Sequence, residues 1–136
     1  MRILAVDHGQ KRIGLALSDE TGTLARPLAV IKHVARLVDA ATVAERAAAH
    51  VAEKIIVGVS YNEEGALNAA GLSAERFAEA LRLQTELPVL LWDESMTTQD
   101  AQFARLSMGA SRKKRAGHLD DVAAAVLLQN YLDSSS

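Results

Sequence analysis

Four acidic residues stand where short apolar runs meet polar sequence. Asp7 ends the first apolar run, Glu94 follows the last strand-like run, and Asp120 and Asp121 open an alanine-rich stretch. A charge at the end of a buried strand is costly unless a metal ion or another charge pairs with it. Carboxylates brought together suit Mg²⁺ or Mn²⁺, and two such ions about 3.5–4 Å apart can drive phosphoryl displacement by water. These residue types therefore indicate metal-assisted phosphodiester hydrolysis.

Each acid also has an ordinary structural explanation. A lone Asp7 is typical of a turn, and a lone Glu94 is typical of an exposed acid or of an ion-pair partner for Arg12. Asp120 and Asp121 stand where a helix begins, and the helix dipole favours acids there without any function. The catalytic interpretation therefore depends on whether the fold brings these carboxylates to one place.

Basic residues are concentrated in two short segments. Lys11 and Arg12 follow Asp7 closely, and a second cluster near the C-terminus consists of Arg112, Lys113, Lys114 and Arg115. Each Lys or Arg that neutralises a phosphate releases counterions, so both segments are candidates for nucleic-acid binding, although basic surface loops are common. Aromatic residues make up only 4% of the chain, so base stacking cannot dominate such binding.

The composition is that of an ordinary globular protein. The 136 residues are 49% hydrophobic and 24% charged, with a net charge of −2 and no cysteine. The absence of cysteine excludes disulfides, thiolate zinc sites and thiol catalysis. No apolar run is long enough for a membrane helix, and the first residues lack the features of a signal peptide. We expect one domain over residues 1–136, in the cytoplasm and with no membrane partner.

The first third of the chain predicts three antiparallel strands. They cover residues 2–7, 12–18 and 25–33, with a tight turn from His8 to Lys11. Residues 2–7 are apolar without alternation, which is typical of a strand covered on both faces. Pro27 predicts that the third strand lies at a sheet edge.

The rest of the chain predicts alternating helices and strands. A helix over 35–50 would bury Leu37 and Val38 and expose Asp39. The elements that follow are a strand over 55–59, a loop over 60–71, a helix over 72–86, a strand over 89–92, a helix from Thr97 to about Met108, a basic loop over 109–117 and a helix over 120–132.

These elements predict an α/β fold with a five-stranded mixed sheet flanked by helices. Right-handed crossovers would place the fourth and fifth strands parallel to the first, on its free side. The order would be 3-2-1-4-5, with strand 2 antiparallel to strand 1. The carboxyl ends of strands 1, 4 and 5 would then meet at one edge, where open α/β sheets usually bind ligands.

Three motifs resemble those of the YqgF/RuvX family. The first is Asp7-x-Gly9-x-Lys11-Arg12-Ile13-Gly14-x-Ala16-x-Ser18-Asp19, and the second is Asp93-Glu94-x-x-Thr97-Thr98. The third is Ser111-Arg112-Lys113-Lys114, followed by Asp120-x-Val122-Ala123-Ala124 and by Leu128-Gln129-x-Tyr131-Leu132. The resemblance covers essentially the whole chain in the family's order.

The resemblance implies an RNase H-like fold related to the RuvC resolvases and a nuclease that uses Mg²⁺ or Mn²⁺, two ions being expected. The family's acidic positions fall on Asp7, Glu94 and Asp120, as catalytic residues and metal ligands. Its members are described as Holliday junction resolvases and as nucleases that process the 5′ end of precursor 16S rRNA. Helical spacing puts Asp120 in line with Leu127 and Tyr131, whereas Asp121 shares a stripe with Leu128.

Two positions depart from the family pattern. Ser60 stands where the family usually has proline, and Ser95 stands where it usually has arginine. Neither change removes a metal ligand. The substrate stays open between four-way DNA junctions and precursor rRNA, and cutting both strands of a two-fold symmetric junction would favour a homodimer.

Two other functions compete with the nuclease. An Asp-Gly hairpin after the first strand also begins the actin and sugar-kinase fold, but such kinases need two domains around the nucleotide and this chain has room for one. A non-catalytic RNA-binding or ribosome-assembly factor with the same fold is the second alternative, and it would bind without divalent metal.

Overall fold

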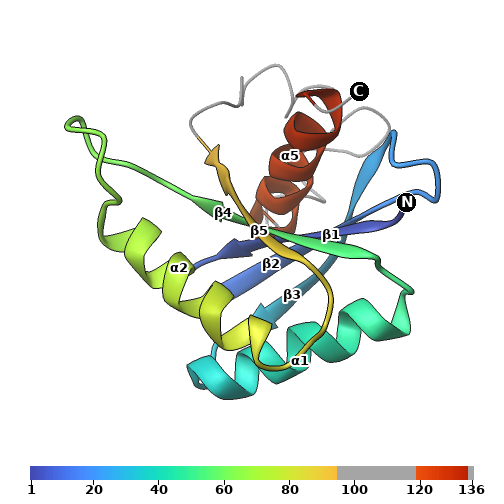
Figure 1. Ribbon diagram of the computed structural model, residues 1–136, viewed down its shortest axis with the longest axis horizontal. Coiled ribbons are helices and arrows are strands. Elements are labelled where there is room, and N and C mark those ends of the chain that lie inside the picture. The colour runs from blue at the N-terminus through green and yellow to red at the C-terminus, as the bar shows by residue number, and fades with distance from the viewer. Residues whose placement is uncertain (95–118, 135–136) are drawn as a thin grey trace.

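The computed structural model describes residues 1–94 and 119–134, with side chains as far as Glu94 and again from Val122. Five strands form one sheet in the order β3-β2-β1-β4-β5, as predicted. Helices α1 and α2 cover one face and α5 covers the other, so the molecule has three layers (Figure 1). The elements are β1 Ile3–His8, β2 Arg12–Ser18, β3 Ala25–Lys32, α1 Arg36–Ala49, β4 Lys54–Val59, α2 Ala69–Arg82, β5 Val89–Asp93 and α5 Leu119–Ser134.

The pairing directions are those expected from right-handed crossovers. β1 pairs with β2 antiparallel, β2 with β3 antiparallel, and β4 runs parallel to both β1 and β5. β3, which contains Pro27, lies at a sheet edge as predicted. Because β1, β4 and β5 run the same way, their carboxyl ends share one edge of the sheet.

The central strands are buried on both faces. Along β1, Leu4 and Val6 face α1 and α2, whereas Ile3 and Ala5 face α5. Side chains alternate along a strand, so every position of the sheet can be assigned to one face or the other. We refer below to the α5 face and to the α1/α2 face.

The buried face of α1 differs from the prediction. Leu37 and Val38 are exposed, whereas Asp39 is only 1% exposed. The Asp39 carboxylate accepts a hydrogen bond from the backbone N–H of Val34 at 3.0 Å and pairs with His33 Nδ1 at 2.5 Å. Ala35, at the N-cap, has no side-chain acceptor for the free N–H groups there. These polar contacts rotate α1 so that its alanine-rich side packs on the sheet.

Helix α2 begins and ends earlier than the predicted 72–86. It begins at Ala69 because the Asn68 side chain caps it, accepting a hydrogen bond from Gly71 N at 2.8 Å. The Ser60 hydroxyl donates to the same Asn68 oxygen at 2.8 Å. A Cβ at Gly71 would lie 2.2 Å from the carbonyl oxygen of Ser60, so only glycine fits where the helix meets the preceding loop. Ser60, one of the departures from the family pattern, is thus part of the cap.

Helix α5 is joined to β3 through one buried amide. Gln129 is 4% exposed, accepts a hydrogen bond from Ala25 N at 2.9 Å and donates to the carbonyl oxygen of Thr23 at 3.0 Å. It also donates to Asp133 at 3.0 Å. The amide therefore fixes α5 relative to the edge strand.

The helix predicted from Thr97 to about Met108 and the basic loop over 109–117 lie outside the described residues. In the part of the chain that the structure describes, no helix is long and apolar enough to cross a membrane.

We predict that Gln129→Leu destabilises the protein by roughly 2–4 kcal/mol, because it leaves the N–H of Ala25 and the carbonyl of Thr23 without partners. Urea unfolding followed by circular dichroism measures the change. Gln84→Leu, on an exposed side chain, is the matched control and should stay within about 0.5 kcal/mol of the wild type. Equal stabilities for the two variants would contradict this account of Gln129.

Candidate functional site

Two carboxyl groups meet on the α5 face at the carboxyl edge of the sheet. Asp7 follows Ile3 and Ala5 in the alternation along β1, so it lies on the α5 face. Trp92 of β5 packs on that face against Tyr131 of α5, with ring centroids 5.1 Å apart. Glu94 comes two residues after Trp92, immediately beyond β5. The predicted convergence of Asp7 and Glu94 is thus present in the structure.

The side chains of Asp7 and Glu94 hydrogen-bond to each other. Such a bond requires one of the two carboxyl groups to hold a proton. Burial raises the pKa of Glu94 above its usual value of 4.5, against the opposing effect of the hydrogen bond with Asp7, and the charge of Asp93 raises the pKa further. Two acids held together in a half-buried place repel each other once both are ionised. The site therefore favours a proton or another cation between them.

Gly58 makes room for this pair. It lies on β4, between β1 and β5, and pairs in register with Trp92. A Cβ at Gly58 would lie 2.6 Å from Oε1 of Glu94 and 2.9 Å from Cδ2 of Leu127. Without a side chain at Gly58, the Glu94 side chain can lie over β4 and reach Asp7. Leu127 of α5 closes the other side of this position.

His8 lies on the opposite face of the sheet. We expected it in the turn after the first strand, but it belongs to the strand itself. It is the last residue of β1, and its ring stacks on Phe77 of α2 with centroids 4.8 Å apart. Burial lowers the pKa of His8, and the nearby charges of His33 and Arg36 act in the same direction while Asp39 opposes them. The stacked His8 ring therefore packs the end of β1 against α2 on the α1/α2 face.

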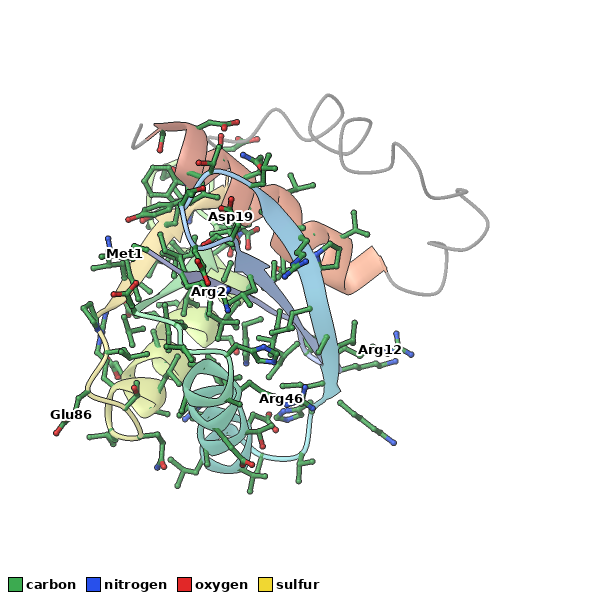
Figure 2. All side chains as sticks on the ribbon, turned by 90° about the vertical axis from the view of Figure 1, so that its right-hand side faces the viewer. Met1, Arg2, Arg12, Asp19, Arg46 and Glu86 are labelled. Atoms are coloured by element: carbon green, nitrogen blue, oxygen red, sulfur yellow. The ribbon has the colours of Figure 1, made fainter. Side chains whose placement is uncertain are left out.

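The hairpin after β1 carries Lys11 and Arg12, and Arg12 lies two residues before Gly14, the partner of Asp7 on β2. Gly9 N donates to the carbonyl oxygen of Arg12 at 3.0 Å, and a Cβ at Gly9 would lie 2.6 Å from that oxygen. Gly9 is therefore needed for the tight turn itself. Figure 2 shows Arg12 projecting outward from this end of the sheet, whereas Met1 and Asp19 lie at the other end.

The other residues that we predicted to belong to the site lie partly or wholly outside the part of the chain that the structure describes. Asp120 and Asp121 are in the first turn of α5, but their side chains are not among those described. Ser95 and the basic cluster of Arg112, Lys113, Lys114 and Arg115 lie outside the described residues. Within residues 1–94 and 122–134, no three His, Asp or Glu side chains are grouped closely enough to hold a metal ion.

Sequence reasoning missed Gly58 and Phe77 as parts of the site. A glycine within the apolar run Ile55–Val59 was a usable sign, since glycine inside a strand often marks a close approach by another group. The stacking of Phe77 on His8 had no local sign, because it joins a strand end to the middle of a helix 69 positions later in the chain.

We predict that Gly58→Ala displaces Glu94 from Asp7, because the added Cβ overlaps Oε1 of Glu94. The variant should lose about 1–3 kcal/mol of stability to overpacking and most of the phosphodiester cleavage that the sequence predicts. Val57→Ala, at the neighbouring position on the α1/α2 face, is the control: it should lose stability but keep activity at a temperature where both proteins are folded. Full activity in Gly58→Ala would contradict this role for Gly58.

We predict a pH-dependent stability difference between Glu94→Gln and the wild type in EDTA. With a folded-state pKa above 4.5, Glu94 holds its proton more tightly in the folded than in the unfolded protein. Wild-type stability should therefore fall as the pH rises from 4.5 through the raised pKa, and Glu94→Gln should lack this fall. Urea unfolding across this range measures the difference, with the exposed Glu86→Gln as control. Parallel stability profiles for Glu94→Gln and the wild type would refute the raised pKa.

Comparison of the sequence with known proteins supports the resemblance over the full length. The sequence pattern of the RuvX family, described as Holliday junction resolvase, matches residues 1–134. A relative from Bacillus cytotoxicus is 40% identical over 136 residues, covering 98% of this chain and 99% of its own. One from Thermoanaerobacter pseudethanolicus is 39% identical over 135 residues, covering 98% and 97%. Both carry the name "Putative pre-16S rRNA nuclease".

Solved structures with little sequence identity share the fold. Thermus thermophilus RuvC, solved with a Holliday junction substrate, aligns with a TM-score of 0.67 at 17% identity over 100% of this chain and 97% of its own. The fowlpox virus resolvase, solved with Holliday junction DNA, aligns with a TM-score of 0.61 at 18% identity over 99% of both chains. The RNase H-like fold implied by the resemblance is confirmed, and the chain belongs to the RuvX (YqgF) family.

Proposed function

We propose that this protein is a divalent-metal-dependent endonuclease that hydrolyses phosphodiester bonds of structured nucleic acid. The observation that carries the proposal is the hydrogen-bonded pair of Asp7 and Glu94, held together at the carboxyl edge of the sheet. Such a pair has no evident use in holding the fold, because two adjacent acids repel each other once both are ionised.

The donor set fits a hard divalent cation. Asp7 and Glu94 supply only oxygen atoms, which are the ligands that hard divalent cations prefer. We assign Asp120 as the third ligand, because it stands two turns before Leu127 on the same stripe of α5, and Leu127 packs against Gly58. Bound Mg²⁺ or Mn²⁺, two ions being expected, would activate the attacking water and stabilise the leaving oxygen.

The chain's own residues bind and orient the substrate. We propose that Lys11 and Arg12, on the hairpin that follows Asp7, offset the repulsion between the acidic pair and a phosphate backbone. We propose that the cluster of Arg112, Lys113, Lys114 and Arg115 contacts phosphates as well. Asp7 and Glu94 would hold the metal against which the reacting phosphate binds, and the missing side chain at Gly58 leaves Glu94 the room to reach Asp7.

We propose precursor 16S rRNA as the substrate, because relatives about 40% identical over nearly the full length are named for it. The family pattern is described as Holliday junction resolvase, which makes four-way DNA junctions the second candidate. Cutting a junction symmetrically would call for a homodimer, whereas a single-site RNA nuclease needs none.

We predict that Asp7→Asn abolishes cleavage while the protein keeps its fold and binds nucleic acid. The assay offers precursor 16S rRNA, single-stranded RNA and four-way DNA junctions with Mn²⁺ or Mg²⁺. Glu94→Gln should behave like Asp7→Asn, since each removes one side of the pair. Glu86→Gln, at an exposed acid that precedes the amino end of β5 and is labelled in Figure 2, should cleave like the wild type.

The outcomes separate the candidate functions. Cleavage of RNA alone would make the protein an rRNA-processing nuclease, and paired symmetric nicks in the junction would make it a resolvase. Full activity in Asp7→Asn would refute the assigned site. Metal-independent binding without cleavage of any substrate would refute the nuclease and favour a non-catalytic RNA-binding or assembly factor.

A further inference from the structure

The side of α1 that points away from the sheet is apolar. Leu37 and Val38, in its first turn, are 61% and 49% exposed, and Val34, just before the helix, is 68% exposed. Exposed residues recur along α1 at a spacing of three or four, so they form one stripe on the helix. We call this stripe the α1 outer face; it consists of Val34, Leu37, Val38, Ala41, Glu45, Ala48 and Ala49.

Among the described residues, no element covers the α1 outer face. The helix packs on the sheet through its opposite side, with Ala40, Val43 and Ala47. Figure 1 shows α1 at the outside of the molecule, on the side away from α5. Helix α2 is equally long and covers the same face of the sheet, but it exposes charged residues such as Arg76 and Glu79. An exposed stripe of leucine, valine and alanine is typical of a surface that binds another protein.

The amino end of α1 favours a negative group. Ala35, at the N-cap position, makes no side-chain hydrogen bond to the N–H groups of the first turn. Those N–H groups have no partner within a helix and give its amino end a partial positive charge. Lys32 and Arg36 add exposed bases nearby. The acid of this turn, Asp39, is buried and bonds to the residues before the helix, so it leaves the amino end uncapped.

We propose that a second copy of this chain packs on the α1 outer face, with the two α1 helices antiparallel about a two-fold axis. Such a dimer uses the same patch on both copies. The largest exposed side chains lie at the amino half of the stripe, so the axis passes between Leu37 and Ala41. The small side chain of Ala41 allows the usual separation of about 8–10 Å between packed helices. This inference does not depend on the proposed nuclease function.

Charge favours the antiparallel arrangement. A parallel pair would place Glu45 beside the partner's Glu45, and like charges brought together oppose binding. In the antiparallel pair, Glu45 lies about 9 Å from the axis along the helix, on the side where the partner's α1 begins. Long helical side chains lean toward the amino end of their own helix, which brings the Glu45 carboxylate over the uncapped first turn of the partner's α1. Each copy would thus complete the helix end of the other.

The α1 outer face is small for an interface. One face of a 14-residue helix buries less than the roughly 1,200 Å² in total at which standard specific interfaces begin. We therefore expect a weak dimer, with a Kd in about the micromolar range. Because α1 and α5 cover opposite faces of the sheet, this dimer would leave the acidic pair uncovered in both copies.

Sedimentation equilibrium of the full chain measures the association. The mass of the wild type should rise from monomer to dimer between about 1 μM and 1 mM. Leu37→Gln/Val38→Gln should weaken the association by at least about tenfold, because it places polar groups at the centre of the contact. The matched control is Leu83→Gln, at an 81% exposed leucine where α2 ends, which should associate like the wild type. Circular dichroism checks that every variant is folded.

An exchange of charges tests the antiparallel geometry. Ala35→Asp places a carboxylate at the amino end of α1, where it repels the partner's Glu45, and Glu45→Lys brings a cation to the partner's uncapped turn. Each substitution alone should weaken the dimer by about fivefold or more, and the two together should restore it to within about twofold of the wild type. Positions 35 and 45 lie about 15 Å apart in one chain, so recovery requires contact between copies. Glu79→Lys, at an exposed acid of α2, should leave the association unchanged.

Three results would overturn the proposal. The first is a wild type that stays monomeric up to about 1 mM. The second is an equal effect of Leu37→Gln/Val38→Gln and Leu83→Gln, which would place the contact elsewhere. The third is a dimer that does not recover in Ala35→Asp/Glu45→Lys, since the antiparallel pairing requires that recovery.

Discussion

The architecture of the site depends on one steric constraint: β4 carries no side chain at Gly58. Glu94 can cross over β4 to Asp7 only because that position on the α5 face is empty. The crossing in turn requires β4 to lie between β1 and β5, parallel to both, so that the three carboxyl ends share one edge. A central glycine weakens a strand, and here the close approach of Glu94 and Leu127 accounts for it.

Because side chains alternate along each strand, the two faces of the sheet carry different groups of residues. The α1/α2 face holds the larger core cluster and the His8–Phe77 stack, which support β1 from behind. The α5 face holds the acidic pair and the start of α5. A one-residue slip in the register of β1 would move Asp7 to the wrong face. The buried amide of Gln129 keeps α5 over the face that holds the acidic pair.

The sheet could be predicted because strands are indicated by short local sequence patterns and their order follows general rules of chain connection. Apolar runs without alternation indicated central strands, Pro27 indicated an edge, and crossover handedness left one order for β4 and β5. The orientation of α1 was not predictable from periodicity, since Asp39 is buried by hydrogen bonds to His33 and Val34. The start of α2 was missed because the Asn68 cap depends on the loop that Ser60 begins.

By itself, the sequence determined the fold class, the strand order, the family motifs and the three acidic positions proposed to bind metal, because these follow from residue type and spacing along the chain. Only the tertiary structure decided that Asp7 and Glu94 share a hydrogen bond and that Gly58 permits it. These features depend on which strands are neighbours and in what register. Neither register nor the closeness of two side chains 87 positions apart is encoded in any short stretch of residues.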